Sequence, residues 1–294
     1  MRLPRIAIAA LLALACGIVA QLAPGGQSQE ARPASASSVA AVAGRAAFTS
    51  LALARVPDRL HAMTKTVPDR NYATSSRNVV GHSEEGSPIA LRQFGDRSIA
   101  GKLLIFGCIH GDECAASSVR PLSTLTAGCP DPESNVFVVP DLNPDGAALG
   151  SRTNSRGVDL NRNFPSEWRP IGSRGYAQYP GPHPFSEPET RLAARIIRAL
   201  RPAATIWFHQ HHGDRPFVRA WGQSVPAARR FATLARMPFH LLPWPAGTAP
   251  NWQNHRFPGT SSFVVELPWG AIEPAMESRL AKAAVRLGRA VSED

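Results

Sequence analysis

The chain has 294 residues, 44% of them hydrophobic and 18% charged, which is enough for one large domain with a sizeable buried core. Lys and Arg outnumber Asp and Glu by 32 to 22, so the formal charge is +10 and long-range fields favour anionic partners. The arginines are scattered, however, and no zinc-finger, recognition-helix or aromatic single-strand-binding pattern accompanies them. We therefore expect no nucleic-acid partner.

The N-terminus has the pattern of an export signal. Arg2 and Arg5 precede an apolar run over residues 6–20, and a segment rich in Ala, Ser, Pro and Gly follows. A basic segment before about 7–15 apolar residues is typical of a secretory signal, and the run is shorter than the about 20 residues of a membrane span. We predict a signal peptide over residues 1–23, a flexible linker over 24–50 and a secreted or cell-envelope location; the alternative is an uncleaved membrane anchor. For an exported protein, this charge favours an anionic cell-wall polymer as a partner; the alternative is a basic surface that serves solubility alone. Contact with a membrane is expected only if the N-terminal segment stays uncleaved.

The ordered domain is expected to begin between residues 50 and 78 with a hairpin. Short apolar segments at residues 79–82 and 88–91 flank a polar, glycine-containing turn, as in a hairpin. Residues 103–109 form a continuous apolar run, typical of a strand buried in a sheet that is covered on both faces. A helix over residues 113–127 is predicted to follow.

The second half of the chain continues the alternation of strands and helices. Ser186 is expected to cap a helix with Pro188 in its first turn and Glu189 in the capping-box position. The buried stripe of that helix is Leu192, Ile196, Ile197 and Leu200. Further buried strands and a C-terminal helix are predicted at residues 135–140, 204–208, 262–266 and 273–291. Such alternation predicts a three-layer α/β/α sandwich with a mixed, largely parallel sheet.

Three cysteines lie beyond the predicted signal: Cys108, Cys114 and Cys129. An odd number leaves at least one thiol unpaired within the chain. Cys108 at a strand end and Cys114 in a first helical turn can meet in a disulfide, whereas Cys114 and Cys129 are expected at opposite ends of one helix. The alternative is that all three are small packing residues.

His110 and Glu113 stand where an apolar strand is predicted to turn into a helix. An imidazole nitrogen and a carboxylate at this spacing can both reach one metal ion, which is zinc-ligand chemistry. His-x-x-Glu also arises by chance, and the alternatives are an ordinary strand-end histidine and a helix N-terminal carboxylate favoured by the dipole. His209 and Glu266 likewise end apolar strands, and in α/β sheets ligands bind beyond the carboxyl ends of the strands.

Four further segments carry a specific resemblance. They are Asn143-Pro144-Asp145-Gly146, residues 157–165 (Gly-Val-Asp-Leu-Asn-Arg-Asn-Phe-Pro), residues 206–210 (Ile-Trp-Phe-His-Gln) and residues 263–268 (Phe-Val-Val-Glu-Leu-Pro). With Arg152 between the first two, the chain resembles the zinc metallocarboxypeptidases, most closely the murein peptide amidases, over roughly residues 76–290. The resemblance implies a zinc carboxypeptidase-like catalytic domain, which we place at residues 51–294.

The resemblance also implies one Zn²⁺ per chain, held by His110, Glu113 and His209. Three protein ligands leave a fourth position for water, as catalytic zinc requires. His211 and His212 compete with His209 for the third ligand position. The apolar strand that precedes His209 and the family pattern favour His209.

Glu266 takes the position of the family's general base. A carboxylate that closes an apolar strand is desolvated, which raises its pKa and suits it to take a proton from zinc-activated water; the alternative is a buried Glu paired with an arginine for structure. By the same resemblance, Arg152 stabilises the oxyanion, and Asn161 and Arg162 bind the terminal carboxylate of the substrate, which suits the rigid fork of a guanidinium. The alternative for both arginines is a surface or loop-bracing ion pair.

Other polar residues near these motifs are expected to support them. Asp159 and Asn163 are predicted to shape their loop, and Asp112 to be structural or to hold a zinc-bound histidine. The tyrosine that the digestive members place over the substrate has no counterpart in this sequence. The candidates for that side are Trp244, Trp252 and His255, with buried packing as the alternative for each tryptophan.

These features predict an exported zinc peptidase that hydrolyses an amide next to a free carboxylate, in a cell-wall peptide such as the γ-D-glutamyl-diaminopimelate link. The nearest alternative is a general metallocarboxypeptidase that removes C-terminal residues from peptides. An N-acyl amino acid deacylase is a further alternative, which the segment over residues 157–165 disfavours. A non-catalytic wall-binding module would be expected to have lost a ligand or the base.

Overall fold

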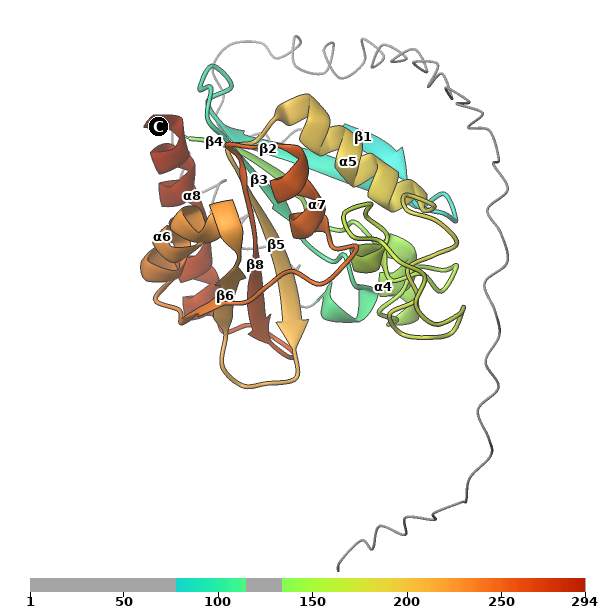
Figure 1. Cartoon of the computed structure of the whole chain (residues 1–294). Coiled ribbons are helices and arrows are strands. Elements are labelled where there is room, and N and C mark those ends of the chain that lie inside the picture. The colour runs from blue at the N-terminus through green and yellow to red at the C-terminus, as the bar shows by residue number, and fades with distance from the viewer. Residues whose placement is uncertain (1–77, 115–133, 294) are drawn as a thin grey trace, which may run out of the picture. The chain divides into compact units, whose positions relative to one another are not determined.

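The computed structural model describes residues 78–114 and 134–293 (Figure 1). The predicted signal peptide, the linker and most of the predicted helix over residues 113–127 lie outside these residues. An eight-stranded sheet with the order β1-β2-β4-β3-β5-β8-β6-β7 forms the centre of the domain. Its strands are β1 (Asn78–His82), β2 (Pro88–Gly95), β3 (Lys102–Phe106), β4 (Asn135–Val139), β5 (Ala204–His211), β6 (Phe217–Ala220), β7 (Phe239–Leu241) and β8 (Ser261–Pro268).

The sheet is mixed, with a parallel centre. Strands β4, β3, β5 and β8 are parallel neighbours. Strands β1 and β2 form the predicted hairpin, and β2 joins β4 antiparallel. On the other side β6 is antiparallel to β8, and β7 is parallel to β6. Because every residue of β4 is buried, both faces of the sheet centre are covered, as the apolar runs predicted.

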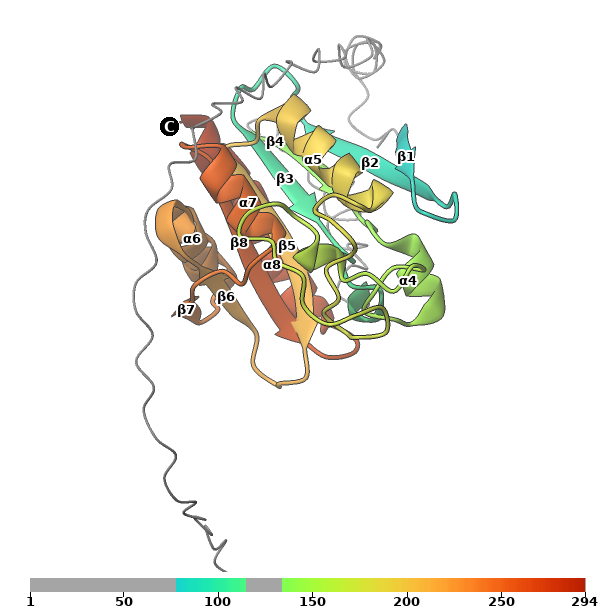
Figure 2. The ribbon, with the colours of Figure 1, turned by 45° about the vertical axis from the view of Figure 1, so that its right-hand side comes forward.

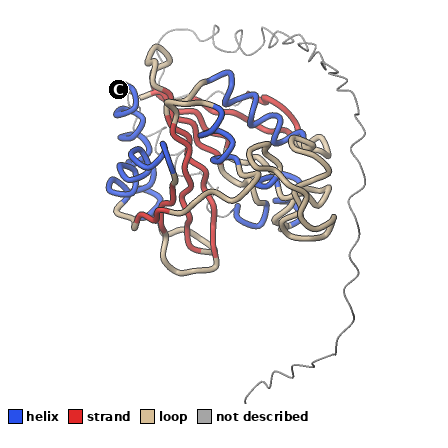
Figure 3. Tube along the Cα trace, viewed as in Figure 1, coloured by secondary structure: helices blue, strands red, loops and turns tan. Residues whose placement is uncertain are grey.

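Helices cover the two faces of the sheet and complete the predicted three layers (Figures 1–3). The helices are α4 (Pro144–Leu149), α5 (Pro188–Leu200), α6 (Val225–Ala235), α7 (Ala249–Arg256) and α8 (Pro274–Glu293), with three short 3₁₀ turns, η1 (Gly111–Glu113), η2 (Leu160–Arg162) and η3 (Gly222–Ser224). Within this part of the chain, no helix combines the length and the apolar character needed to cross a membrane.

The register of β5 and β8 assigns the helices to the faces. Ile206 is paired with Phe263, and the Phe263 ring packs on Phe231 of α6 at 5.7 Å between centroids. The neighbouring residue Thr205 points to the opposite face, where its Oγ1 accepts a hydrogen bond from Gln253 of α7 at 2.8 Å. Helix α8 packs against α6, whereas α5 lies on the side of α7 in both views (Figures 1 and 2).

Two element boundaries differ from the prediction. Strand β3 ends at Phe106 rather than at residue 109, because the chain turns at Cys108, whose φ of 50° lies in the left-handed region. The N-cap of α5 is Glu187 rather than Ser186. The Ser186 hydroxyl is not free to cap the helix, since it donates to Glu187 Oε1 at 2.6 Å and accepts from Asn163 Nδ2 at 2.9 Å. The apolar stripe of α5 is buried as predicted.

Candidate active site

His110, Glu113 and His209 meet at the carboxyl ends of two neighbouring strands. His110 and Glu113 follow β3, His209 lies in β5, and all three are buried. The Nδ1 atoms of His110 and His209 each lie 2.8 Å from a different oxygen of Glu113 and 3.1 Å from each other. The ligand atoms of the three residues all fall within 4.8 Å of one another. The structure therefore brings together the three side chains that the sequence predicted as zinc ligands.

The rival histidines are not part of this cluster. His211 packs on the ring of Phe217, and its Nε2 lies 3.0 Å from the carbonyl oxygen of Arg215. His212 stacks on Trp269 with 4.4 Å between ring centroids. Of the three histidines, His209 alone completes the group with His110 and Glu113.

The Asn-Pro-Asp-Gly segment explains how the first two candidate ligands are held. Asn143 caps α4, since its Oδ1 accepts from Gly146 N at 3.0 Å, and its Nδ2 donates to the carbonyl of Ile109 at 3.3 Å. A Cβ atom at Gly111 would collide with the backbone of Gly146. Only glycine at position 111 therefore lets η1 pack against α4. This packing fixes the spacing of His110 and Glu113, the candidate ligands before and after Gly111.

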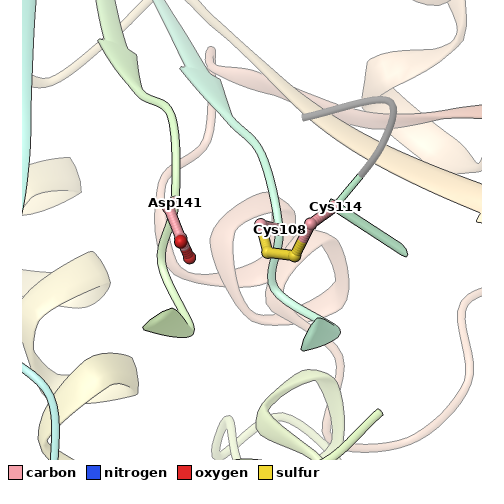
Figure 4. Close-up of side chains that lie close together, drawn as sticks. All are labelled: Cys108, Cys114 and Asp141. Carbon is pink, nitrogen blue, oxygen red and sulfur yellow. A yellow bond between two sulfur atoms is a disulfide. The ribbon is translucent and has the colours of Figure 1, made fainter. Parts of the chain in front are cut away.

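A disulfide joins Cys108 and Cys114 and spans both candidate ligands (Figure 4). Their Cα atoms are 4.7 Å apart. The structure therefore contains the disulfide that the sequence analysis gave as possible. Asp141 lies beside the two sulfur atoms. Burial raises the pKa of Asp141 to about 6, aided by the nearby charge of Asp145 and opposed by a hydrogen bond from the Asn143 backbone.

Asp159 supports His110 from behind. Its Oδ1 lies 3.1 Å from His110 Nε2, and its Oδ2 accepts from Arg152 Nε at 3.0 Å. It also caps η2 by accepting from the Asn161 backbone at 2.9 Å, which is the predicted loop-shaping role. Asp112 makes no hydrogen bond to either histidine among the described residues, so the supporting role offered for it was wrong and belongs to Asp159.

The electrostatics of the cluster come from two ionised carboxylates around the histidine rings. Burial by itself would lower the pKa of His110, but Glu113 and Asp159 raise it to about 9. Burial opposes ionisation of Asp159, yet His110 and Arg152 hold the pKa of its carboxyl well below its ordinary value. The pKa of Glu113 is likewise lowered by the two histidines against the effect of burial. Two imidazoles and one ionised carboxylate, with one ring fixed by a buried aspartate, fit an open zinc site.

Glu266 and the predicted substrate-binding residues line one pocket of about 360 Å³ with the cluster. Glu266 in β8 is paired in register with His209 in β5, so both side chains project from the same face of the sheet. Glu266 is partly exposed rather than fully desolvated, which differs from the expectation, and no described residue hydrogen-bonds its carboxylate. Arg152 reaches into the same space, where its Nη1 donates to Glu113 Oε1 at 3.2 Å.

Asn161 and Arg162 also lie on the pocket wall, but they differ in how many of their hydrogen-bonding groups are already occupied within the protein. The Asn161 amide is occupied within the protein: its Oδ1 accepts from Ala249 N at 3.0 Å, and its Nδ2 lies 3.3 Å from His209 Nε2. Arg162 donates to the carbonyl of Asn161 at 2.8 Å and to Gln178 Oε1 at 3.3 Å. Three of the five N–H groups of its guanidinium therefore remain for a ligand.

Among the described residues no tyrosine lines the pocket, and part of its wall is formed by residues outside the motifs. Trp244 lines the pocket, as one of the sequence alternatives stated. Trp252 instead packs among aromatic rings, and His255 bonds the carbonyl of Asn251 away from the pocket wall. Arg219 and Trp269 were missed, because neither belongs to a motif. Arg219 reaches the site through the pairing of β6 with β8, and Trp269 directly follows β8.

Residues 132–237 match the model of the zinc carboxypeptidase family, so this part of the chain is similar to a zinc carboxypeptidase. Murein peptide amidase A of Escherichia coli strain K12 is 38% identical over 117 residues, which are 36% of this chain and 48% of that protein. Carboxypeptidase B of Astacus astacus is 31% identical over 192 residues, 56% of this chain and 63% of that protein. The chain thus spans about half the length of the murein peptide amidase that it matches in sequence. The solved structure of murein-tripeptide amidase MpaA from Escherichia coli O157 superposes with a TM-score of 0.59 and 26% identity, covering 76% of this chain and 97% of that one.

Proposed function

We propose that the protein is a zinc-dependent peptidase that hydrolyses an amide bond next to a free carboxylate in cell-wall peptides. The observation that carries the proposal is that one pocket is lined by the proposed metal ligands, the proposed base and the two proposed substrate-binding arginines: His110, Glu113, His209, Glu266, Arg152 and Arg162. The names of the murein peptide amidases that resemble the chain support a muropeptide as the substrate. The predicted signal and the charge of +10 agree with an exported protein that meets an anionic wall polymer.

His110, Glu113 and His209 would hold one zinc ion through two Nδ1 atoms and a carboxylate oxygen. When bound, zinc supplies a Lewis acid that lowers the pKa of water and polarises a carbonyl. Asp159 would fix the tautomer of His110, because its Oδ1 accepts the proton on Nε2 and leaves Nδ1 for the metal.

Glu266 is the proposed general base. Its carboxylate faces the pocket on the same side as His209 and has no hydrogen bond to a described residue, so both oxygens are available. It would take the proton from the attacking water and then pass it to the leaving amine. The partial exposure of Glu266 leaves water with access to this carboxylate.

The two arginines would bind the two negatively charged groups of the reacting substrate, which are the oxyanion and the free carboxylate. Arg152 is held by Asp159 through Nε and by Glu113 through Nη1 and lines the pocket, where its remaining N–H groups would stabilise the oxyanion of the transition state. Arg162 would pair with the free carboxylate of the substrate through its remaining N–H groups. Asn161 would contribute less than predicted to this carboxylate, because its own amide is already bonded within the protein.

A general metallocarboxypeptidase is the second candidate, since the match to carboxypeptidase B extends over 192 residues. Incubation of the zinc-loaded protein with a muropeptide, a hippuryl-type peptide and an N-acetyl amino acid separates the alternatives. We expect cleavage of the muropeptide, with Glu266→Gln as the inactive control. Preferred cleavage of the hippuryl peptide would favour the carboxypeptidase, preferred cleavage of the N-acetyl amino acid the deacylase, and no cleavage at all a wall-binding module.

A further inference from the structure

Arginines line the outer surface of α5 and α7, two helices that lie on the same side of the sheet (Figures 1 and 2). Every exposed side chain of α5 that is longer than alanine is an arginine: Arg191, Arg195 and Arg198. Their spacing of four and three residues places them on one face of the helix. Arg201 follows as the C-cap of α5, and Arg256 is exposed at the end of α7. We call Arg195, Arg198, Arg201 and Arg256 the arginine surface.

Aromatic rings hold three of these guanidinium groups in place. The guanidinium carbon of Arg198 lies 5.4 Å from the centre of the Trp252 ring. Those of Arg201 and Arg256 lie 4.5 Å and 5.5 Å from the centre of the same ring, that of Phe257. Trp252 and Phe257 are buried and contact each other, with 5.5 Å between their centroids. Cation–π contacts therefore gather three charges from two helices over one aromatic layer.

The arginine surface has no neutralising partner among the described residues. No ion pair within 4.0 Å joins Arg195, Arg198, Arg201 or Arg256 to an acidic side chain of this part of the chain. Burial and the charge of Arg256 both lower the pKa of Arg198, so like charges act on each other here. An anion from outside the protein would remove this repulsion.

The arginine surface is separate from the candidate active site, since none of its residues lines the pocket. Arg201 precedes β5 and Arg256 precedes β8, so both lie near the amino ends of these strands. His209 and Glu266 lie toward the carboxyl ends of the same strands. A ligand on the arginine surface would therefore leave the pocket open.

The chemistry of this surface favours a chain of phosphate groups. No large apolar side chain of α5 or α7 is exposed, whereas a helix that lies on a membrane buries Trp, Phe or Leu beside its cations. The two oxygens of a planar carboxylate can be satisfied by one guanidinium fork. A tetrahedral phosphate presents its oxygens in several directions, which suits guanidinium groups that converge on one ring from two helices.

We propose that the arginine surface binds a linear polymer of phosphate groups and holds the protein on it while the pocket stays free. The inference rests on the encounter with an anionic wall polymer in the proposed function, and not on the peptidase reaction. It assigns that encounter to one surface of the fold.

The test measures binding of the full chain to fluorescently labelled polyphosphate at a fixed salt concentration. The variant with Arg198→Gln, Arg201→Gln and Arg256→Gln should bind at least about 10-fold more weakly than the wild type. Arg256→Gln alone, at an exposed helix end, should weaken binding about 3-fold and gives a reading even if the triple variant does not fold.

The matched control removes the same charge from another exposed helix. It carries Arg229→Gln, Arg230→Gln and Arg236→Gln in α6 and at its C-cap. Like Arg201, Arg236 is a C-cap in the left-handed region, and Arg229 also lies over a ring, that of Phe239. We expect this variant to lose less than about 3-fold in affinity, because exposed charges far from the ligand are screened by salt.

Equal losses in the two triple variants would mean that binding follows net charge, which would overturn the proposal, as would a wild type that does not bind polyphosphate. Tighter binding to poly-L-glutamate or to vesicles of anionic lipid would assign the surface to carboxylates or to a membrane and also overturn it. Cleavage of a soluble muropeptide by the same proteins keeps the two proposals apart. Loss of polyphosphate binding with retained cleavage supports the arginine surface. If polyphosphate binding follows the expected pattern and the wild type cleaves nothing, the peptidase function fails alone.

Discussion

Glu266 and His209 lie opposite each other in the register of β5 and β8, so one residue pair places the proposed base beside the proposed metal. Glu266→Gln keeps the size and polarity of the side chain but cannot take a proton. We predict a loss of at least about 10²-fold in kcat with unchanged zinc content. Steady-state kinetics and metal analysis check this, with the exposed Glu273→Gln as control. An active Glu266→Gln enzyme would mean that another group is the base.

Asp159 connects the proposed metal site to the oxyanion arginine, because it contacts both His110 and Arg152. Asp159→Asn keeps the shape and removes the charge that orients His110. We predict a loss of about 10–100-fold in zinc affinity, measured by competition with a chelator. Asp112→Asn is the control, since Asp112 bonds neither histidine. A larger effect of Asp112→Asn would return the supporting role to that residue.

At the scale of elements, the turn that carries His110 and Glu113 is closed by the Cys108–Cys114 bond. A loop of this length is worth about 2 kcal/mol of stability in the chain-entropy model. We predict that Cys108→Ser with Cys114→Ser lowers the free energy of unfolding by about that amount and weakens zinc binding, as measured by urea unfolding and chelator competition. Cys129→Ser should do neither. Unchanged zinc affinity in the double variant would show that the packing of Gly111 on α4 positions the ligands without the bond.

The junction between the β1–β2 turn and α5 contains a buried carboxylate that titrates near neutral pH. Glu189 is fully buried, and its Oε1 accepts from the Glu84 backbone at 3.0 Å. Burial raises the pKa of Glu189 from 4.5 to about 7, opposed by the hydrogen bonds that it accepts and aided by the charge of Glu187. The folded state therefore binds a proton that the unfolded state releases between these two pH values, so stability falls as pH rises from 4.5 to 7.

Replacing Glu189 by Gln should remove this pH-dependent cost. The difference between 4.5 and about 7 corresponds to roughly 3 kcal/mol. We predict that Glu189→Gln raises the free energy of unfolding by up to that amount above pH 7 and changes it little at pH 4.5. Urea unfolding at both pH values measures the effect, with Glu85→Gln on the exposed part of the turn as control. A variant that is less stable than the wild type at pH 8 would contradict the prediction.

At the scale of the whole molecule, the features that could be predicted from the sequence depend on local residue patterns. The features that were missed depend on how distant segments pack together. Continuous apolar runs identified the central strands, and the strand before His209 distinguished it from His211 and His212. The support of His110 by Asp159 was missed, because it depends on how a loop 49 residues further along packs on the strand ends. The cap of α5 was wrong by one residue, because Asn163 engages the Ser186 hydroxyl. Arg219 enters the pocket only through the pairing of β6 with β8, and no local signal marks it.

The proposed metal also connects parts of the fold that are distant in sequence, since two ligands follow β3 and the third lies in β5. Zinc that binds only the folded state stabilises it by about 4 kcal/mol when free zinc exceeds Kd 1,000-fold. For a domain of this size we predict that a chelator lowers Tm by roughly 8–16 °C and that added zinc restores it. Thermal unfolding followed by circular dichroism measures the shift. His209→Ala should melt at the same temperature with and without chelator, whereas His211→Ala should keep the full response, because His211 lies outside the cluster. A chelator effect that survives in His209→Ala would place the metal elsewhere in the chain.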